Sequence, residues 1–164
     1  ISYPRNPLFP DLGLHTMIAD KSGDAFILEE GSNTNAVSPI YNDFIVMTNF
    51  PNGKFKETNY KEVHGIGSDR YICAYEYINN IDSFGIKEAF EVLNKTSQEN
   101  TLCTIVYEPL KNEIYISFKK DLSKKWKISL MDKTIQSLDG FLSNNKIQFT
   151  NGEIYVKDLI TLYK

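Results

Sequence analysis

Apolar positions in the first part of the chain follow the spacing of short β-strands. Four apolar-rich runs of strand length come first, and they cover residues 14–20, 24–30, 37–40 and 44–48. The connection between the first two runs is short and contains Gly23, which predicts a hairpin. The later two runs are expected to continue this sheet as a meander. Pro39 is expected at an edge or a strand end, because proline has no amide hydrogen to donate to a neighbouring strand.

From Ser68 the spacing of apolar residues becomes helical. Apolar residues of a first helix recur at i, i+1, i+3, i+4 and i+7, as Tyr71, Ile72, Ala74, Tyr75 and Ile78. Ser68 or Asp69 is expected to cap this helix. A second helix is predicted with Ser83 as its N-cap. Its apolar face carries Ile86, Ala89, Phe90 and Leu93, and charged residues occupy the opposite face.

Strand spacing returns after the second helix. The runs predicted as strands are residues 101–107, 113–118, 126–130, 147–149 and 153–156. The first two are expected to form a hairpin with the third run beside it, and the last two form one more hairpin. A short helical or extended tail follows from 157 to 164. Strands, a helical pair and strands again predict an α+β fold, in which a helix layer lies on an antiparallel sheet within a single domain, 1–164.

Composition narrows the classes of function. The chain has 164 residues, 41% of them hydrophobic, which suits one core of ordinary size. Its formal net charge of -3 and scattered Lys and Arg residues argue against nucleic acid as a partner. No apolar run reaches the length of a membrane span, so no membrane partner is expected. The compartment is left open, with the cytoplasm expected for a soluble bacterial protein.

The two cysteines and two histidines offer little chemistry by spacing alone. Cys73 falls in a helical pattern and Cys103 in a strand pattern, where buried thiols that act as small hydrophobes are expected. His15 and His64 are too isolated for a recognisable ligand pair, so neither a metal nor another cofactor is expected.

Five segments in a fixed order carry a resemblance to a known family. They are LHTMIAD at 14–20, DAFILEE at 24–30, FIVMTNFP at 44–51, GSDRY at 67–71 and TLCTIVYEPLKNEIYISF at 101–118. In this order, with two amphipathic helices before the last segment, they resemble the C-terminal part of the linear-amide C–N hydrolases. This group of N-terminal-nucleophile hydrolases includes choloylglycine hydrolase, penicillin V acylase and acyl-CoA:6-aminopenicillanate acyltransferase. The resemblance covers about residues 14 to 119 and implies part of an αββα sandwich.

The resemblance also implies a reaction. In N-terminal-nucleophile hydrolases a Cys, Ser or Thr at the mature N-terminus attacks an amide carbonyl, and its own α-amino group acts as the base. Other groups orient that amine, donate hydrogen bonds to the oxyanion and hold the substrate. The family landmark for such a donor is a Thr-Asn pair after a strand, which matches Thr48 and Asn49 in this chain. Asn49 would therefore place its amide near the oxyanion or the amine of the nucleophile.

Arg70 is the second residue that the resemblance singles out. The family has an arginine at the start of the helix after a Ser-containing turn, and residues 67–71 match that arrangement. Arg5 is the chain's other arginine, so a permanently charged guanidinium is rare in this Lys-rich sequence. Each candidate has a plain alternative. Asn49 begins a stretch rich in Asn, Pro and Gly that suits an ordinary turn. Arg70 suits a salt bridge with Asp69 or a neighbouring acid.

The family pattern also includes Asp20, Gly23 and Glu29, which we interpret as structural, forming a hairpin turn and a strand end. The family's nucleophilic Cys, with its nearby Arg and Asp, has no counterpart in this chain, which begins Ile1-Ser2. We therefore expect a C-terminal portion of a hydrolase or acyltransferase that acts on small linear amides of the bile-salt, penicillin or N-acyl type. No enzyme assignment is made for the chain by itself.

Two classes of function remain at this stage. The alternative is a noncatalytic module on the same scaffold that binds a small amide or a protein partner. In either case half of a sandwich leaves one sheet face without its partner. We expect that face to be apolar and to be covered by the missing segment or by a second copy of the chain in a homo-oligomer.

Overall fold

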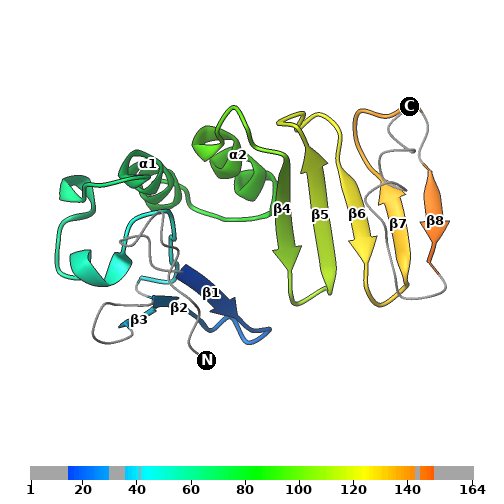
Figure 1. Cartoon of the computed structure of the whole chain (residues 1–164). Coiled ribbons are helices and arrows are strands. Elements are labelled where there is room, and N and C mark those ends of the chain that lie inside the picture. The colour runs from blue at the N-terminus through cyan, green and yellow to red at the C-terminus, as the bar shows by residue number, and fades with distance from the viewer. Residues whose placement is uncertain (1–14, 30–35, 41, 143–144, 150–164) are drawn as a thin grey trace, which may run out of the picture. The chain divides into compact units, whose positions relative to one another are not determined.

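The computed structural model describes residues 15–29, 36–40, 42–142 and 145–149. Contacts divide the chain into two compact units, Ile1–Asp82 and Ser83–Lys164. Within the described residues each unit contains one α-helix and one antiparallel sheet (Figure 1), so the predicted α+β class is confirmed. The expectation of a single domain stays a prediction, and the two units are presented separately below.

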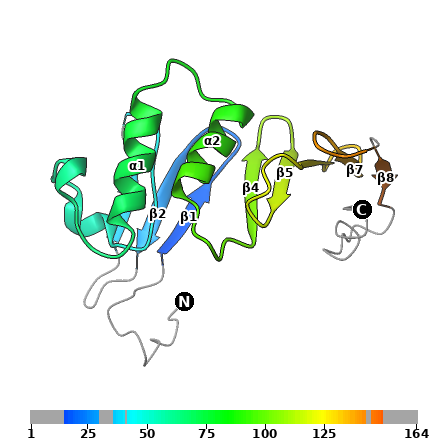
Figure 2. The same cartoon turned by 90° about the horizontal axis from the view of Figure 1, so that it is seen from above.

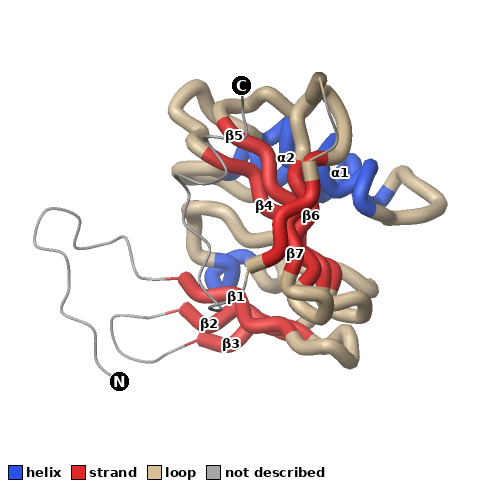
Figure 3. The backbone as a smooth tube through the Cα atoms, turned by 90° about the vertical axis from the view of Figure 1, so that its right-hand side faces the viewer, coloured by secondary structure: helices blue, strands red, loops and turns tan. Residues whose placement is uncertain are grey.

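The first unit contains a three-stranded antiparallel sheet. Its strands are β1 (His15–Ala19), β2 (Ala25–Glu29) and β3 (Ala36–Pro39), and they lie side by side in chain order (Figure 3). The predicted hairpin between β1 and β2 is confirmed. Pro39 is the last residue of β3, which is an edge strand of this sheet, as expected.

A carboxylate and a glycine build the β1–β2 turn. Asp20 Oδ1 accepts hydrogen bonds from the backbone amides of Ser22 at 2.7 Å and Asp24 at 3.3 Å. Gly23 has a φ of 91°, in the left-handed region that glycine adopts without steric cost. The hydrogen bonds from Ser22 lower the pKa of the Asp20 carboxyl group below its usual range. The structural interpretation of Asp20 and Gly23 is therefore confirmed.

The strand predicted at 44–48 is absent. Phe44 makes one isolated bridge, and no strand follows it. The carbonyl groups of this segment bind side chains instead of a neighbouring strand: Val46 O accepts from Asn52 Nδ2 at 2.7 Å, and His15 Nδ1 lies 3.3 Å from Thr48 O. The apolar run therefore forms an anchored loop that leads to Asn49.

The first helix, α1 (Ser68–Asn79), begins where the apolar spacing predicted. Its predicted cap is wrong, since neither Ser68 nor Asp69 caps it and the N-cap is Gly67, with a φ of 87°. The Ser68 hydroxyl instead donates to the carbonyl oxygen of Gly65 at 2.9 Å. Two short 3-10 turns precede α1, namely η1 (Asn52–Phe55) and η2 (Tyr60–Glu62).

The core of the first unit lies on one side of its sheet. α1 runs over that side in front of β2 (Figure 2), and the buried residues include Ala25, Ile27, Phe50, Val63 and Ala74. Phe50 makes edge-to-face contacts with Phe55 and Tyr71, at ring-centroid distances of 5.3 and 4.9 Å. Phe50, the residue after Asn49, is therefore held in the core by these contacts.

The opposite face of the same sheet is apolar and open within the first unit. Ile18, Leu28 and Val37 are 45%, 36% and 56% exposed. Ile18 pairs across the strands with Phe26, and Leu28 pairs with Val37. An apolar sheet face of this kind is what the sequence predicted.

The second unit begins with α2 (Ile86–Thr96), which packs against the first strand of a five-stranded sheet. Ser83 was predicted to cap this helix, and this prediction is wrong. Gly85 is the N-cap, and its backbone amide donates to Glu88 Oε2 at 3.0 Å. Ala89 and Phe90 are buried as expected, and Val92 joins them.

The sheet of the second unit is an antiparallel meander in the order β4-β5-β6-β7-β8 (Figure 1). Its strands are β4 (Cys103–Glu108), β5 (Glu113–Phe118), β6 (Trp126–Ser129), β7 (Thr134–Ser137) and β8 (Lys146–Gln148). The strands predicted for this unit up to residue 130 are confirmed, with small shifts at their ends. The sequence did not predict β7. The strand expected at 153–156 and the tail from 157 lie outside the described residues.

Trp126 is the centre of the second core. It is fully buried with Ile128 and Ile135, and the rings of Phe118 and Phe141 meet its indole edge-on at 5.6 and 4.5 Å. Two of these core residues face each other across β6 and β7, because Ile128 pairs with Ile135. Alternate positions on these strands therefore form one apolar layer.

Three buried serines tie strand ends to the connections that follow them. Ser117 Oγ, near the end of β5, donates to Asp121 O at 2.6 Å. Ser129 Oγ, the last residue of β6, donates to the Asp132 carboxylate at 3.0 Å. Ser137, the last residue of β7, accepts from the backbone amide of Asn145 at 2.8 Å. Each buried hydroxyl group thus has a hydrogen-bond partner, and the bond ties the end of a strand to the connection that follows it.

Both cysteines are free, but their burial differs from the prediction. Cys73 in α1 is half-buried, and Cys103 at the start of β4 is exposed. β4 is an edge strand whose Ile105 and Tyr107 are also exposed on the face that carries Cys103. Among the helices described here, none has the length and apolar character required to cross a membrane.

Candidate functional site

The structure brings the two predicted site residues into direct contact. Arg70 Nη2 donates a hydrogen bond to Asn49 Oδ1 at 2.6 Å, although the residues are 21 positions apart in the sequence. A guanidinium only donates hydrogen bonds, so the carbonyl oxygen of the Asn49 amide must face it. The Nδ2 group of Asn49 is then left as a donor, with no hydrogen-bond partner among the described residues.

The alternative reading of Arg70 as a salt-bridge residue is not what the structure shows. Within the described part of the chain, none of the ion pairs includes Arg70. Asp69, the expected partner, is exposed in the first turn of α1. There its carboxylate suits the positive end of the helix dipole.

The turn at Gly67 leaves the space that the contact between Asn49 and Arg70 requires. Thr48 Oγ1 donates to Gly67 O at 2.9 Å, which ties the Asn49 loop to the residue that caps α1. A Cβ atom at Gly67 would lie 2.8 Å from Arg70 Nη2 and 3.1 Å from the backbone nitrogen of Asn49. Gly67 therefore supplies both a left-handed backbone and the space for the guanidinium.

A buried carboxylate holds the other end of the Asn49 loop. Glu29, at the end of β2, is 4% exposed. Its Oε1 accepts from the backbone amide of Asn52 at 2.5 Å, and its Oε2 accepts from that of Gly53 at 2.6 Å. His15 Nδ1 lies 3.6 Å from Glu29 Oε1. The sequence interpretation of Glu29 as a structural strand end is correct but omits these contacts.

The aromatic neighbour of Arg70 is uncharged near neutral pH. Tyr71 packs against Phe50, and burial, reinforced by the nearby Tyr75, raises the pKa of its phenol above the usual range. Arg70 is therefore the charged group that contacts Asn49 directly. An amide donor beside a fixed positive charge is suited to a carbonyl oxygen on which negative charge develops.

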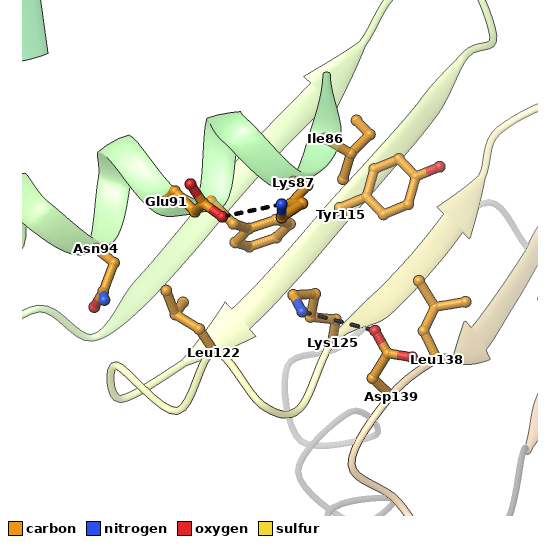
Figure 4. A pocket seen from close by; sticks show the side chains of 10 residues that line it. Ile86, Lys87, Glu91, Asn94, Tyr115, Leu122, Lys125, Leu138 and Asp139 are labelled. Carbon is orange, nitrogen blue, oxygen red and sulfur yellow. Dashed lines mark ion pairs between the residues drawn. The ribbon is translucent and has the colours of Figure 1, made fainter. Parts of the chain in front are cut away.

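The second unit contains a separate hollow of about 490 Å³ between α2 and the sheet (Figure 4). Its apolar lining includes Phe90 of α2, and two ion pairs lie at its walls. They join Lys87 to Glu91 at 3.6 Å and Lys125 to Asp139 at 3.7 Å. The charges of these four residues cancel, so the hollow shows no preference for ligands of one sign. Its lining includes neither predicted site residue.

The sequence did not predict the contacts by which His15, Glu29, Thr48 and Gly67 support this arrangement. A signal was present for Glu29, because it ends a run in which alternate residues are buried and a buried carboxylate needs partners. No sequence pattern marked Gly67, because its role depends on its distance from Arg70 in the fold.

The arrangement as a whole consists of donors without a nucleophile. Asn49 and Arg70 can bind and polarise a carbonyl oxygen, and neither of them can attack it. The described residues contain no group of three or more His, Cys, Asp or Glu side chains placed to hold a metal ion. Comparison of the chain with protein-family models, with curated proteins and with solved structures finds no significant match.

Proposed function

We propose that this chain is the C-terminal portion of a hydrolase or acyltransferase acting on linear amide C–N bonds, in which Asn49 and Arg70 stabilise the oxyanion. The substrate is a small amide of the bile-salt, penicillin or N-acyl type. The N-terminal Cys nucleophile belongs to polypeptide outside these 164 residues. The proposal rests on the resemblance of residues 14–119 and on the contact between Asn49 and Arg70.

The single observation that carries the proposal is the orientation of the Asn49 amide. Arg70 Nη2 holds Asn49 Oδ1 at 2.6 Å, which leaves Nδ2 to donate to a ligand. Neither a turn-forming Asn nor a surface Arg has a general reason to meet the other across 21 residues. A positive charge behind the amide also strengthens the Nδ2 donor, since it polarises the amide group.

The proposed reaction begins when the α-amino group of the nucleophile takes the thiol proton and the thiolate attacks the amide carbon. The carbonyl oxygen becomes an oxyanion, which accepts a hydrogen bond from Asn49 Nδ2. Collapse of this intermediate breaks the C–N bond, and the amine leaves with the proton held by the α-ammonium group. Water, or an acyl acceptor in an acyltransferase, then releases the acyl group from the thioester.

An αββα sandwich is the finer fold that we propose with this function. The open face of the β1–β2–β3 sheet supports it, because Ile18, Leu28 and Val37 are apolar and exposed there. In a sandwich such a face packs on a second sheet. The segment that carries the nucleophile would supply that sheet, and a second copy of the chain in a homo-oligomer is the alternative cover.

The alternative function is a noncatalytic module that binds a small amide or a protein partner on the same scaffold. The donors of Asn49 and Arg70 would serve such a module equally well. The coding sequence upstream of Ile1 discriminates between the two functions. A Cys that opens a strand, with an Arg and an Asp soon after it, supports the enzyme.

The test compares the 164-residue chain with a complete enzyme, defined as this chain joined to the nucleophile-bearing segment. We expect the chain alone to hydrolyse neither conjugated bile salts, penicillin V nor simple N-acyl amino acids, and the complete enzyme to hydrolyse at least one. In the complete enzyme Asn49→Ala should lower kcat about a hundredfold or more, the usual effect of losing an oxyanion donor. Its fold should be retained, because Asn49 is exposed.

Asn59→Ala is the matched control, because Asn59 is another exposed asparagine of the first unit and its side chain binds, among the described residues, only the nearby amide of Lys61. It should leave kcat unchanged. Equal rates for Asn49→Ala and Asn59→Ala would remove the role assigned to Asn49. Hydrolysis by the isolated chain that survives mutation of both Cys73 and Cys103 would contradict the external nucleophile.

A further inference from the structure

Glu29 is a buried carboxylate of the first unit whose two oxygens are both bound by backbone amides. It is 4% exposed, and a buried carboxylate is costly unless hydrogen bonds compensate it. Both of its oxygens accept backbone amides of η1, at 2.5 Å from Asn52 and 2.6 Å from Gly53. Bonds this short between an amide and a carboxylate are among the stronger hydrogen bonds in proteins.

Gly53 is what allows the backbone to approach the carboxylate so closely. A Cβ atom at this position would lie 3.1 Å from Glu29 Oε2 and 3.0 Å from Ala36 Cβ. The glycine therefore lets the turn sit directly against the ends of β2 and β3. The position of η1 relative to the sheet is fixed by this contact.

The same carboxylate reaches the other side of Asn49 through His15. His15 Nδ1 lies 3.6 Å from Glu29 Oε1 and 3.3 Å from the carbonyl oxygen of Thr48. Thr48 is the residue before Asn49, and its hydroxyl donates to Gly67 O at 2.9 Å, in the turn that leads to Arg70. Glu29 thus has contacts to both flanks of Asn49, directly on one side and through His15 on the other.

We infer that Glu29, assisted by His15, is a positioning residue for the Asn49–Arg70 pair. It touches neither of these side chains in any hydrogen bond and acts by fixing the loop that carries Asn49. The catalytic consequence of this inference rests on the proposed function, whereas its structural consequence does not. An oxyanion donor must be held within fractions of an ångström, because small misplacements are costly in rate.

The experiment has a structural arm on the 164-residue chain and a kinetic arm on the complete enzyme, both with Glu29→Gln. Glutamine keeps the size of the side chain but presents an NH₂ group, which cannot accept, to one of the two backbone amides. In the structural arm, NMR should show the Asn52 and Gly53 amide protons moving upfield. The side-chain signals of Asn49 and Arg70 should shift as well. In the kinetic arm, kcat should fall about ten- to a hundredfold with KM nearly unchanged.

Ile27→Val is the control, because Ile27 is fully buried on the same strand and the same face, two positions before Glu29. It should lower the thermal midpoint of the first unit while leaving the Asn49 and Arg70 signals and kcat as in the parent protein. Glu29→Asp, whose shorter carboxylate keeps both acceptors, should recover part of the kcat lost in Glu29→Gln.

Two results would overturn the inference. One is a Glu29→Gln chain in which the amides of Asn52 and Gly53 shift but the Asn49 and Arg70 side-chain signals do not. The other is a loss of kcat in Ile27→Val as large as that in Glu29→Gln, which would make the effect one of general stability. A complete enzyme with no turnover before any mutation would instead contradict the proposed function, and the NMR arm would still decide the role of Glu29.

Discussion

Gly67 and Gly23 form a natural pair for testing whether the Asn49–Arg70 contact is built into the fold. Both lie in the first unit and both have a left-handed backbone, with φ of 87° and 91°. Their surroundings differ. A Cβ atom at Gly23 would meet nothing within 4 Å, whereas one at Gly67 would lie 2.8 Å from Arg70 Nη2. Alanine at either position therefore imposes the same backbone strain. Only at Gly67 does its methyl group also conflict sterically with a neighbouring side chain.

The expected loss of stability has two contributions, the strain of a left-handed alanine and, at Gly67, the steric conflict with Arg70. A left-handed alanine costs about 1–2 kcal/mol, and this applies to both variants. At Gly67 the new methyl group also displaces the guanidinium, which removes the hydrogen bond from Arg70 to Asn49 and adds about 1 kcal/mol. We therefore expect Gly67→Ala to lower the free energy of unfolding of the first unit by about 2–3 kcal/mol. Gly23→Ala should lower it by about 1–2 kcal/mol.

The assay must report on the first unit alone. The chain's single tryptophan, Trp126, lies in the second unit, so its fluorescence follows a different core. Amide hydrogen exchange of the buried β2 residue Ile27, measured by NMR in each variant, gives the free energy of opening for the first unit. The Arg70 side-chain resonances, recorded in the same samples, show whether the guanidinium has moved.

Two results would contradict these expectations, and the two measurements distinguish them. If Gly67→Ala and Gly23→Ala destabilise the first unit by the same amount, the guanidinium is not held against Gly67. If Gly67→Ala is the more destabilising but the Arg70 signals stay in place, the extra cost comes from the backbone of Asn49, 3.1 Å from the new Cβ atom. Either result would weaken the oxyanion proposal, because the orientation of Asn49 depends on Arg70.

Three further predictions concern the second unit. Ile128→Ala removes a core residue that is 5% exposed, so it should destabilise this unit by about 2–5 kcal/mol, as read from Trp126 fluorescence in urea. Burial, together with the hydrogen bond to Glu113, raises the pKa of Tyr115, so Tyr115→Phe should remove one late-ionising phenol from an absorbance titration. Because the folded pKa is raised, the stabilisation by Tyr115 is complete below the usual tyrosine pKa of about 10 and is lost as the pH rises through the folded value. Cys103 is exposed and Cys73 half-buried, so a thiol reagent should modify Cys103 first in the folded protein, with order of labelling read by peptide mapping.

The sequence predicted those elements whose apolar residues recur with a clear period or form runs bounded by turn residues. The β1–β2 hairpin, α1 and the strands up to β6 are all of this kind. The prediction of a strand at 44–48 was wrong, because periodicity shows which side chains are apolar and not which donors hydrogen-bond to the backbone carbonyl groups. In the fold, the side chains of Asn52 and His15 take the place of a neighbouring strand. The short β7 was missed because Ile135 is its single apolar residue and its other buried position is a serine, Ser137.

The candidate site was only partly predictable for a related reason. Asn49 and Arg70 were chosen by resemblance, and no sequence pattern could show that they meet at 2.6 Å. That contact requires the left-handed turn at Gly67, and a lone glycine in a sequence fits many kinds of turn. The helix caps failed similarly, because Gly67 and Gly85 take the positions that Ser68 and Ser83 suggested. At Gly67 a tertiary contact from Thr48 holds the turn, whereas at Gly85 the hydrogen bond to Glu88 is local to the helix start.

The buried serines of the second unit restrict the positions at which residues can be inserted into its chain. Ser117 and Ser129 each bind a residue in the tight connection that follows, so a residue inserted between the serine and its partner would break a buried hydrogen bond. Ser137 instead binds Asn145 and so joins the two ends of a longer connection. The turn between β4 and β5 has no such serine, and Leu110 at its tip is almost fully exposed. We therefore expect a peptide tag or a fluorescent label inserted at Leu110 to leave the buried serine bonds and the Trp126 core undisturbed.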